Sequence, residues 1–171
     1  PNIVYVGSVH DSVYADVGFN LYGAHIFKST DGGVSFTEMS DGFPIKTPTA
    51  INAIVVHPEN PDVAYIMTSL HESTTSIGIY KTTDGAQSWA AVSNGLDPET
   101  NDLQMDRLAP DTLYAATESG VYKTTDGAKT WQLASDGLPL QFRSPQYGPV
   151  IDLAMDPVNP LVLYAITPEH V

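Results

Sequence analysis

The sequence lacks cysteine altogether, and this absence excludes several kinds of chemistry. Without thiols the chain forms no disulfide, holds no zinc through thiolates and has no cysteine nucleophile. Basic residues are also scarce, because seven Lys and Arg stand against 20 Asp and Glu and give a formal net charge of −13. A field of that sign repels phosphate backbones and anionic membrane surfaces, so we expect no nucleic-acid partner.

Long apolar runs are missing as well. The apolar runs, such as residues 54–56, are far too short to cross a bilayer, so we expect no membrane insertion. The five histidines lack metal-ligand spacing, and we expect neither a metal nor a cofactor. The chain has 171 residues, 42% of them hydrophobic, which is enough to bury a real core. The absence of cysteine fits an extracytoplasmic bacterial protein, and we expect a secreted, periplasmic or cell-surface location.

An internal repeat organises the chain. A Pro, one further residue, two apolar or small residues and a Tyr occur four times, and the tyrosines are 60, 49 and 50 residues apart: Tyr5, Tyr65, Tyr114 and Tyr164. Short segments with period-2 alternation or β-branched and aromatic residues accompany this pattern, and no stretch shows sustained helical periodicity. A repeat of this length built only from strands is typical of propellers and solenoids.

Each repeat predicts four short strands. The first strands are expected at 51–57, 102–106 and 151–156, and the second at 63–68, 112–117 and 162–167. The third are expected at 26–29, 79–82 and 121–124, and the fourth at 35–40, 88–93 and 130–135. The predicted fold class is therefore all-β, a β-propeller segment of about 3.5 four-stranded antiparallel blades. It forms a single partial propeller over 1–171, with a blade part at 1–43, blades at 50–96 and 101–138, and a half blade at 150–171.

An eight-residue motif, S/T-x-D-G-[G/A]-x-[S/T]-[W/F], lies between each third and fourth strand. In such a turn an Asp carboxylate accepts several backbone N–H bonds, and Gly tolerates positive φ. The closing ring is expected to anchor neighbouring blades. The residues predicted to be structural are Ser29, Asp31, Gly33, Phe36, Thr82, Asp84, Gly85, Trp89, Thr124, Asp126, Gly127 and Trp131.

These motifs resemble the Asp-box, or BNR, repeat of bacterial sialidases, sortilin-type receptors, family 74 xyloglucanases and many secreted bacterial propellers. The resemblance covers nearly the whole chain and implies the fold, whereas the families that share the box differ in activity. It also implies that the boxes lie at the blade periphery, away from a ligand or catalytic site. Gly33 matches the family's glycine position, but Ala86 and Ala128 depart from it, which predicts a slightly relaxed turn in the second and third boxes.

The chain starts at a second strand and stops after another second strand. Because three and a half units do not easily close a ring of four to eight blades, we expect further blades of the same parent chain as partners. Pairing of the last strand with another copy is the alternative.

The connections of variable length all fall on the face opposite the Asp-boxes, where extra length favours recognition. The insertion at 10–23 interleaves aromatic and acidic residues that suit sugars, apolar pockets or cations; a loop folded on its own aromatics is the alternative. The connection 139–149 holds one of two arginines and favours an acidic partner, with a plain loop as the alternative. The candidate binding residues are His10, Asp11, Tyr14, Asp16, Phe19, Tyr22, His71, Glu72, Phe142, Arg143 and Tyr147.

No catalytic residue is predicted. The sialidase resemblance implies three arginines for a substrate carboxylate, but the chain has only Arg107 and Arg143. A family 74 glycosidase needs two carboxylates across a cleft, whereas the strand-associated aspartates recur with the repeat. The sequence therefore predicts a non-catalytic recognition or scaffold propeller that binds a protein or glycan through the face opposite the Asp-boxes. The alternative is a fragment of a polysaccharide-acting glycoside hydrolase.

Overall fold

The computed structural model describes residues 2–8, 25–40, 43, 49–70, 76–97, 99–140 and 147–168. They fall into two compact units, Pro1–Ala91 and Val92–Val171, which are described separately. In this part of the chain we find no helix long and apolar enough for a membrane span.

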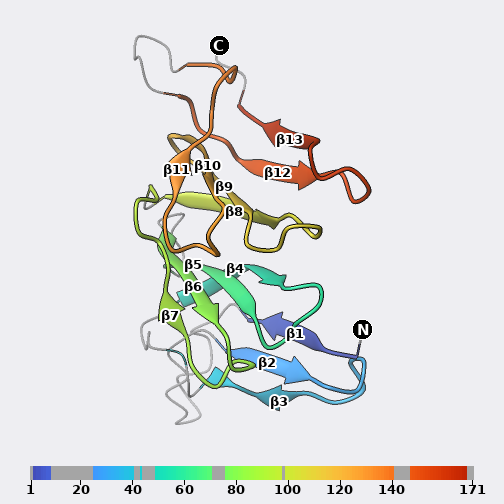
Figure 1. Cartoon of the computed structure of the whole chain (residues 1–171). Coiled ribbons are helices and arrows are strands. Elements are labelled where there is room, and N and C mark those ends of the chain that lie inside the picture. Colours follow the sequence, from blue (N-terminus) through green and yellow to red (C-terminus); the bar gives the residue numbers. More distant parts are fainter. Residues whose placement is uncertain are drawn as a thin grey trace. The chain divides into compact units, whose positions relative to one another are not determined.

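The first unit holds two antiparallel sheets whose strands follow chain order (Figure 1). One is the three-stranded sheet β1 (Val4–Gly7), β2 (Ile26–Ser29) and β3 (Thr37–Glu38). The other is the four-stranded sheet β4 (Thr49–Val56), β5 (Ala64–Leu70), β6 (Ser76–Thr82) and β7 (Ala90–Ala91).

The second unit repeats this plan. Its four-stranded sheet contains β8 (Thr100–Met105), β9 (Leu113–Thr117), β10 (Gly120–Thr124) and β11 (Gln132–Leu133), and a two-stranded sheet contains β12 (Asp152–Met155) and β13 (Leu163–Ile166). Consecutive strands pair antiparallel throughout, which confirms the predicted all-β fold class of four-stranded blades. The first strand of each blade lies at one sheet edge and the fourth at the other.

The fourth strands are shorter than predicted. Six residues were expected in each, but β3, β7 and β11 have two. The reason is that a serine hydroxyl, instead of a backbone carbonyl, accepts the next N–H of the third strand. In the last blade the Ala134 N–H still donates to the Val121 carbonyl, and the Ser135 hydroxyl then accepts the Val121 N–H at 2.8 Å. Ser40 does the same for the Ile26 N–H at 3.1 Å. The segment stays bonded, but as a turn.

The second and third strands place the repeated tyrosines opposite the repeated lysines. The register pairs Tyr5 with Lys28, Tyr65 with Lys81 and Tyr114 with Lys123. Each Lys Nζ lies 5.1–5.4 Å from the centroid of its partner ring. Such a cation–π contact, with the lysine stem along the ring, contributes about 0.5–1 kcal/mol at an exposed site. The recurrence of lysine at this position thus has a structural cause.

Each unit buries its own apolar cluster. In the first unit Ile26, Ile66 and Trp89 belong to one cluster that also includes Ala86. In the second, Val121, Val150 and Leu153 form the corresponding cluster with Ala116. Full burial of a Val, Ile or Leu side chain contributes roughly 1.5–3 kcal/mol. These clusters hold the strands of each unit together.

Candidate functional site

The first Asp-box is a closed hydrogen-bond ring around one carboxylate. Asp31 Oδ1 accepts the Ser29 hydroxyl at 2.7 Å and the N–H groups of Val34 and Ser35 at 3.1 and 3.0 Å. Asp31 Oδ2 accepts the Ser35 hydroxyl at 2.6 Å. The Ser29 oxygen in turn accepts the Gly33 N–H at 2.9 Å. Both carboxylate oxygens are therefore used inside the turn.

The other two boxes have the same geometry. Asp84 accepts the Thr82 hydroxyl at 2.8 Å and the Ser88 N–H at 2.9 Å, and its other oxygen accepts the Ser88 hydroxyl at 2.5 Å. Asp126 accepts the Thr124 and Thr130 hydroxyls, both at 2.7 Å, and the Thr130 N–H at 3.0 Å. The three repeated aspartates thus share one environment.

This bonding fixes the charge of the carboxylates. The Ser88 hydroxyl, the Ser88 N–H and the Thr82 hydroxyl lower the pKa of Asp84 from 3.8 to about 2. Hydrogen bonds from Ser35 and Ser29 hold the pKa of Asp31 well below its usual range, and those from Thr130 and Thr124 do so for Asp126. A carboxylate of this kind carries no proton near neutral pH and has no oxygen to spare, so it suits a structural turn rather than acid catalysis.

The turn does not relax where alanine replaces glycine. Ala86 and Ala128 have φ values of 76° and 69°, in the same left-handed region as Gly33 at 94°. Their N–H groups still donate to the Thr82 and Thr124 hydroxyls, at 2.9 and 3.2 Å. The prediction of a relaxed turn is therefore wrong. Both alanine side chains are fully buried, and burying a methyl group partly offsets the strain of a positive φ.

The closing rings differ between the boxes. Trp89 and Trp131 are 6% and 5% exposed, and Trp131 Nε1 donates to the Val92 carbonyl, just after β7, at 2.8 Å. Trp89 Nε1 is buried and finds no partner among the described residues. Phe36 is 45% exposed, so in the described structure it does not supply the anchor that the motif predicted.

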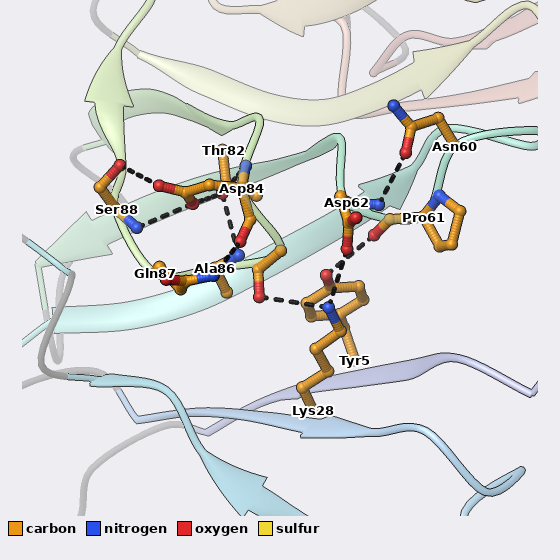
Figure 2. A network of polar contacts seen from close by, with 11 residues as sticks. Tyr5, Lys28, Asn60, Pro61, Asp62, Thr82, Asp84, Ala86, Gln87 and Ser88 are labelled. Carbon is orange, nitrogen blue, oxygen red and sulfur yellow. Dashed lines mark hydrogen bonds and ion pairs between the residues drawn. The ribbon is translucent and has the colours of Figure 1, made fainter.

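In the first unit the Asp-box of one blade also forms a hydrogen bond with the neighbouring blade (Figure 2). Lys28 Nζ donates to Asp62 Oδ1 at 3.1 Å and to the Gly85 carbonyl at 3.3 Å. The Tyr5 hydroxyl donates to the Pro61 carbonyl at 2.9 Å. Within the blade, the Gly85 N–H donates to the Asp62 carbonyl at 3.0 Å. We call this contact between Tyr5, Lys28, Pro61, Asp62 and Gly85 the blade latch.

The opposite end of the blades carries a polar cluster in the second unit. The Ser119 hydroxyl donates to Asp97 Oδ2 at 2.5 Å and lies 3.4 Å from the Tyr122 hydroxyl. Asn101 Nδ2 donates to Glu118 Oε1 at 3.0 Å and to the Val150 carbonyl at 2.9 Å. We call Asp97, Asn101, Glu118, Ser119 and Tyr122 the opposite-face cluster. Its hydroxyls and carboxylates can exchange hydrogen bonds with a polar ligand.

Sequence reasoning missed these residues, although one signal was available. Asn52 and Asn101 stand two residues before the matched Ile54 and Leu103, and each lies at a register shift of its first strand. A β-bulge changes the direction of its side chain, so an Asn that recurs at the bulge of two blades indicates a position with a specific role. Asp97 lies in the connection 97–100, which is one of the variable connections on the face opposite the Asp-boxes, although sequence reasoning did not identify it as a binding residue. Glu118 lies in the short turn between β9 and β10, whose length gave no such signal.

Most of the predicted binding residues lie outside the described residues. These are His10, Asp11, Tyr14, Asp16, Phe19, Tyr22, His71, Glu72, Phe142 and Arg143. Tyr147 is described: its hydroxyl donates to Asp136 Oδ1 at 3.1 Å, and this hydrogen bond raises the pKa of Tyr147. Tyr147 also forms an isolated bridge with Leu140 at the same end of the blade. Within the described ranges, no group of three acidic or histidine side chains is arranged to hold a metal ion.

Two carboxylates on neighbouring first strands converge. The Leu153 N–H donates to Asp102 Oδ2 at 3.2 Å and to Asp152 Oδ1 at 2.9 Å. Asp102 lies on β8 and Asp152 on β12, at matching positions of the repeat. Asp102 Oδ2 also accepts Gln104 Nε2 at 3.0 Å. Because one N–H serves both side chains, their oxygens lie close together.

The repeated sheets and the three turns define an Asp-box β-propeller. A family profile described as "Sortilin, neurotensin receptor 3" matches residues 24–143, which is more than half of the chain. The chain therefore belongs to the Sortilin-Vps10 family. No curated protein matches it significantly.

Solved structures with the same fold include enzymes and a peptide-bound protein. An ancestral GH74 enzyme is similar with a TM-score of 0.66 and 22% identity over 96% of this chain and 20% of that chain. The GH74 xyloglucanase from Xanthomonas campestris has a TM-score of 0.57 and 14% identity, over 96% of this chain and 33% of that chain. The structure of YCF48 bound to D1 peptide has a TM-score of 0.52 and 20% identity, over 80% of this chain and 40% of that chain. The chain thus spans two fifths or less of these structures, and at such identities the likeness shows the fold alone.

Proposed function

We propose that the protein is a non-catalytic recognition or scaffold propeller that binds a protein or glycan through the face opposite the Asp-boxes. The observation that carries this proposal is how differently the carboxylates are used at the two blade ends. In the Asp-boxes, both oxygens of Asp31, Asp84 and Asp126 are bonded within their own turns. In the opposite-face cluster, Asp97 is half-buried and accepts the Glu99 N–H and the Ser119 hydroxyl, whereas Glu118 is exposed and among the described residues uses only Oε1, so its other oxygen can accept a hydrogen bond from a ligand.

The chemistry of that cluster suits a neutral or hydroxyl-rich partner. Ser119 and Tyr122 supply hydroxyls, Asn101 an amide and Asp97 a carboxylate, which together both donate and accept hydrogen bonds. The YCF48 structure bound to a peptide supports recognition as a role for this fold. The net charge of −13 and the lack of cysteine support a secreted, periplasmic or cell-surface bacterial protein.

The test is a screen of peptide and glycan arrays with the purified chain, followed by affinity measurements on any hit. The variants Asp97→Asn and Glu118→Gln should each weaken binding about tenfold, the effect of losing a charge-assisted hydrogen bond. Asp111→Asn makes the same charge change at the Asp-box end and should leave binding unaltered. Equal affinity of all variants would reject the opposite face as the binding surface.

A second candidate is a segment of a polysaccharide-acting glycoside hydrolase. Two observations favour it: the convergence of Asp102 and Asp152, and the similarity to GH74 enzymes. Glycoside hydrolysis uses a carboxylate pair. If this candidate holds, the chain or its parent releases reducing sugar from a polysaccharide such as xyloglucan, and Asp102→Asn or Asp152→Asn abolishes the release. Absence of turnover in the parent protein, or turnover that survives both substitutions, rejects this role for the pair.

A further inference from the structure

A cavity lies at the Asp-box end of the second unit, away from the opposite-face cluster. It has a volume of about 210 Å³, and its lining includes Met105, Arg107, Leu108, Met155, Pro157 and Pro160. These residues come from the end of β8 and the turn that follows it, and from the end of β12 and the turn that follows it. Because small-molecule pockets usually have roughly 300–1,000 Å³, this volume fits a single large side chain better than a whole ligand.

The two turns expose an unusual amount of apolar surface. Leu108 and Val158, at the tips of the two turns, are 77% and 86% exposed. The matching turn in the first unit has the charged Glu59 at this position. An exposed cluster of this kind marks an interaction surface.

Arg107 adds a positive charge to this apolar surface. Its guanidinium has no ion pair within the part of the chain that the structure describes. Each of the two carboxylates beside it uses one oxygen inside its own turn: Asp106 Oδ1 accepts the Leu108 and Ala109 N–H groups at 2.8 and 3.1 Å, and Oδ1 of Asp156, which also lines the cavity, accepts those of Val158 and Asn159, both at 2.8 Å. The planar fork of Arg107 is thus available for a carboxylate from outside.

We propose that this cavity binds an extended segment of a partner protein in which an acidic residue stands beside a large apolar one. The apolar side chain enters between Met105 and Met155, and the carboxylate pairs with Arg107. Methionine side chains adapt to differently shaped apolar groups, which suits a peptide ligand. The described residues that line the cavity include no aromatic ring, so they offer no stacking surface of the kind that a sugar ring needs. The site is separate from the opposite face and does not depend on the function proposed above.

The four methionines allow a direct test, because Met105 and Met155 line the cavity whereas Met39 and Met67 lie in the first unit. The whole chain, labelled with ¹³C at the methionine methyl groups, is titrated with blocked hexapeptides. Each peptide carries one Glu directly beside, or one residue away from, a Leu, Phe or Met. We expect the Met105 and Met155 signals to shift and those of Met39 and Met67 to stay unchanged. Replacing the peptide Glu by Gln should weaken binding about tenfold.

Two variants distinguish specific peptide binding from non-specific apolar association. Arg107→Gln should weaken binding of the Glu peptide about tenfold and abolish the difference between Glu and Gln peptides. Lys129→Gln removes one positive charge elsewhere and should change nothing. The proposal is overturned if no peptide shifts Met105 and Met155 at millimolar concentration, or if the Glu and Gln peptides bind the wild type equally. It is also overturned if the two signals shift with protein concentration alone, because a second copy of the chain would then be the occupant.

Discussion

At the scale of single residues, the Asp-box carboxylate is the side chain on which each turn depends. Asp126 accepts four hydrogen bonds, from the Thr124 and Thr130 hydroxyls and from the Lys129 and Thr130 N–H groups. If the carboxylate is removed, these donors must find water, and the turn loses the acceptor that holds its two ends together.

Asp126→Ala should therefore lower the melting temperature of the chain by about 5 °C. Asp111→Ala is the matched control, because it removes an exposed carboxylate from the neighbouring turn. The control should shift the melting temperature by less than about 2 °C. Differential scanning calorimetry measures both, and an equal effect of the two substitutions would contradict the structural role of the box.

Ala86 combines an unfavourable and a favourable contribution to stability, because its φ is 76° and its side chain is completely buried. Ala86→Gly relieves the strain but loses a buried methyl group and makes the unfolded chain more flexible. We expect the stability to change by no more than about 1 kcal/mol. Ala86→Val places a β-branched side chain at positive φ in a filled site and should cost about 2–4 kcal/mol. Urea unfolding midpoints test this, and a Val variant as stable as the Gly variant would show that the strain is absent.

At the scale of elements, the blade latch joins β1 and β2 of one sheet to the turns of the next. Lys28 is largely buried, whereas Asp62 is 60% exposed, so solvent screens the pair. A double-mutant cycle with Lys28→Met and Asp62→Asn should give a coupling free energy of about 0.5–1 kcal/mol. The coupling should shrink in 1 M salt.

Lys123→Met, at a position with no ion pair in the described structure, should show no such salt dependence. Zero coupling at low salt would mean that the ion pair does not stabilise the blade junction.

Strand order and turn positions could be predicted because the sequence repeats them. The motif at 124–131 fixed the hairpin between β10 and β11, and the tyrosine spacing fixed β1, β5, β9 and β13. The length of the fourth strands could not be predicted, because Ser40 and Ser135 replace the ladder with side-chain bonds that strand propensity does not report. The blade latch was also missed, since it depends on which turn faces Lys28 in three dimensions.

The candidate sites were predictable only in part. The repeat pointed to the Asp-boxes, and the structure gives all three one geometry. The loop residues around His10 and Arg143 lie outside the described residues, so their role in binding stays a prediction. The cavity near Arg107 is accompanied by one signal in the sequence, because Leu108 and Val158 stand where the turn of the first unit carries Glu59.

At the scale of the whole molecule, the boxes link stability to pH. The pKa of Asp84 is about 2 in the folded chain and near 3.8 when unfolded, so the unfolded state binds more protons as the pH falls. The stabilisation is complete above about pH 5 and is lost as the pH falls from about 4 to 2. The urea midpoint of the wild type should therefore fall more steeply between pH 5 and pH 3 than that of Asp84→Asn, which does not titrate. Parallel curves would contradict this linkage.

The most direct test of the account is an NMR titration of the aspartate side-chain carboxyl carbons, with the amide spectrum recorded to show that the chain stays folded. We expect Asp31, Asp84 and Asp126 to keep the chemical shifts of ionised carboxylates at pH 3, because hydroxyl and N–H donors of their own turns lower their pKa values. If these three carboxyls titrate in the folded chain with midpoints at or above 3.8, the turns are not closed around the carboxylates, and the repeated blade has lost its defining contact.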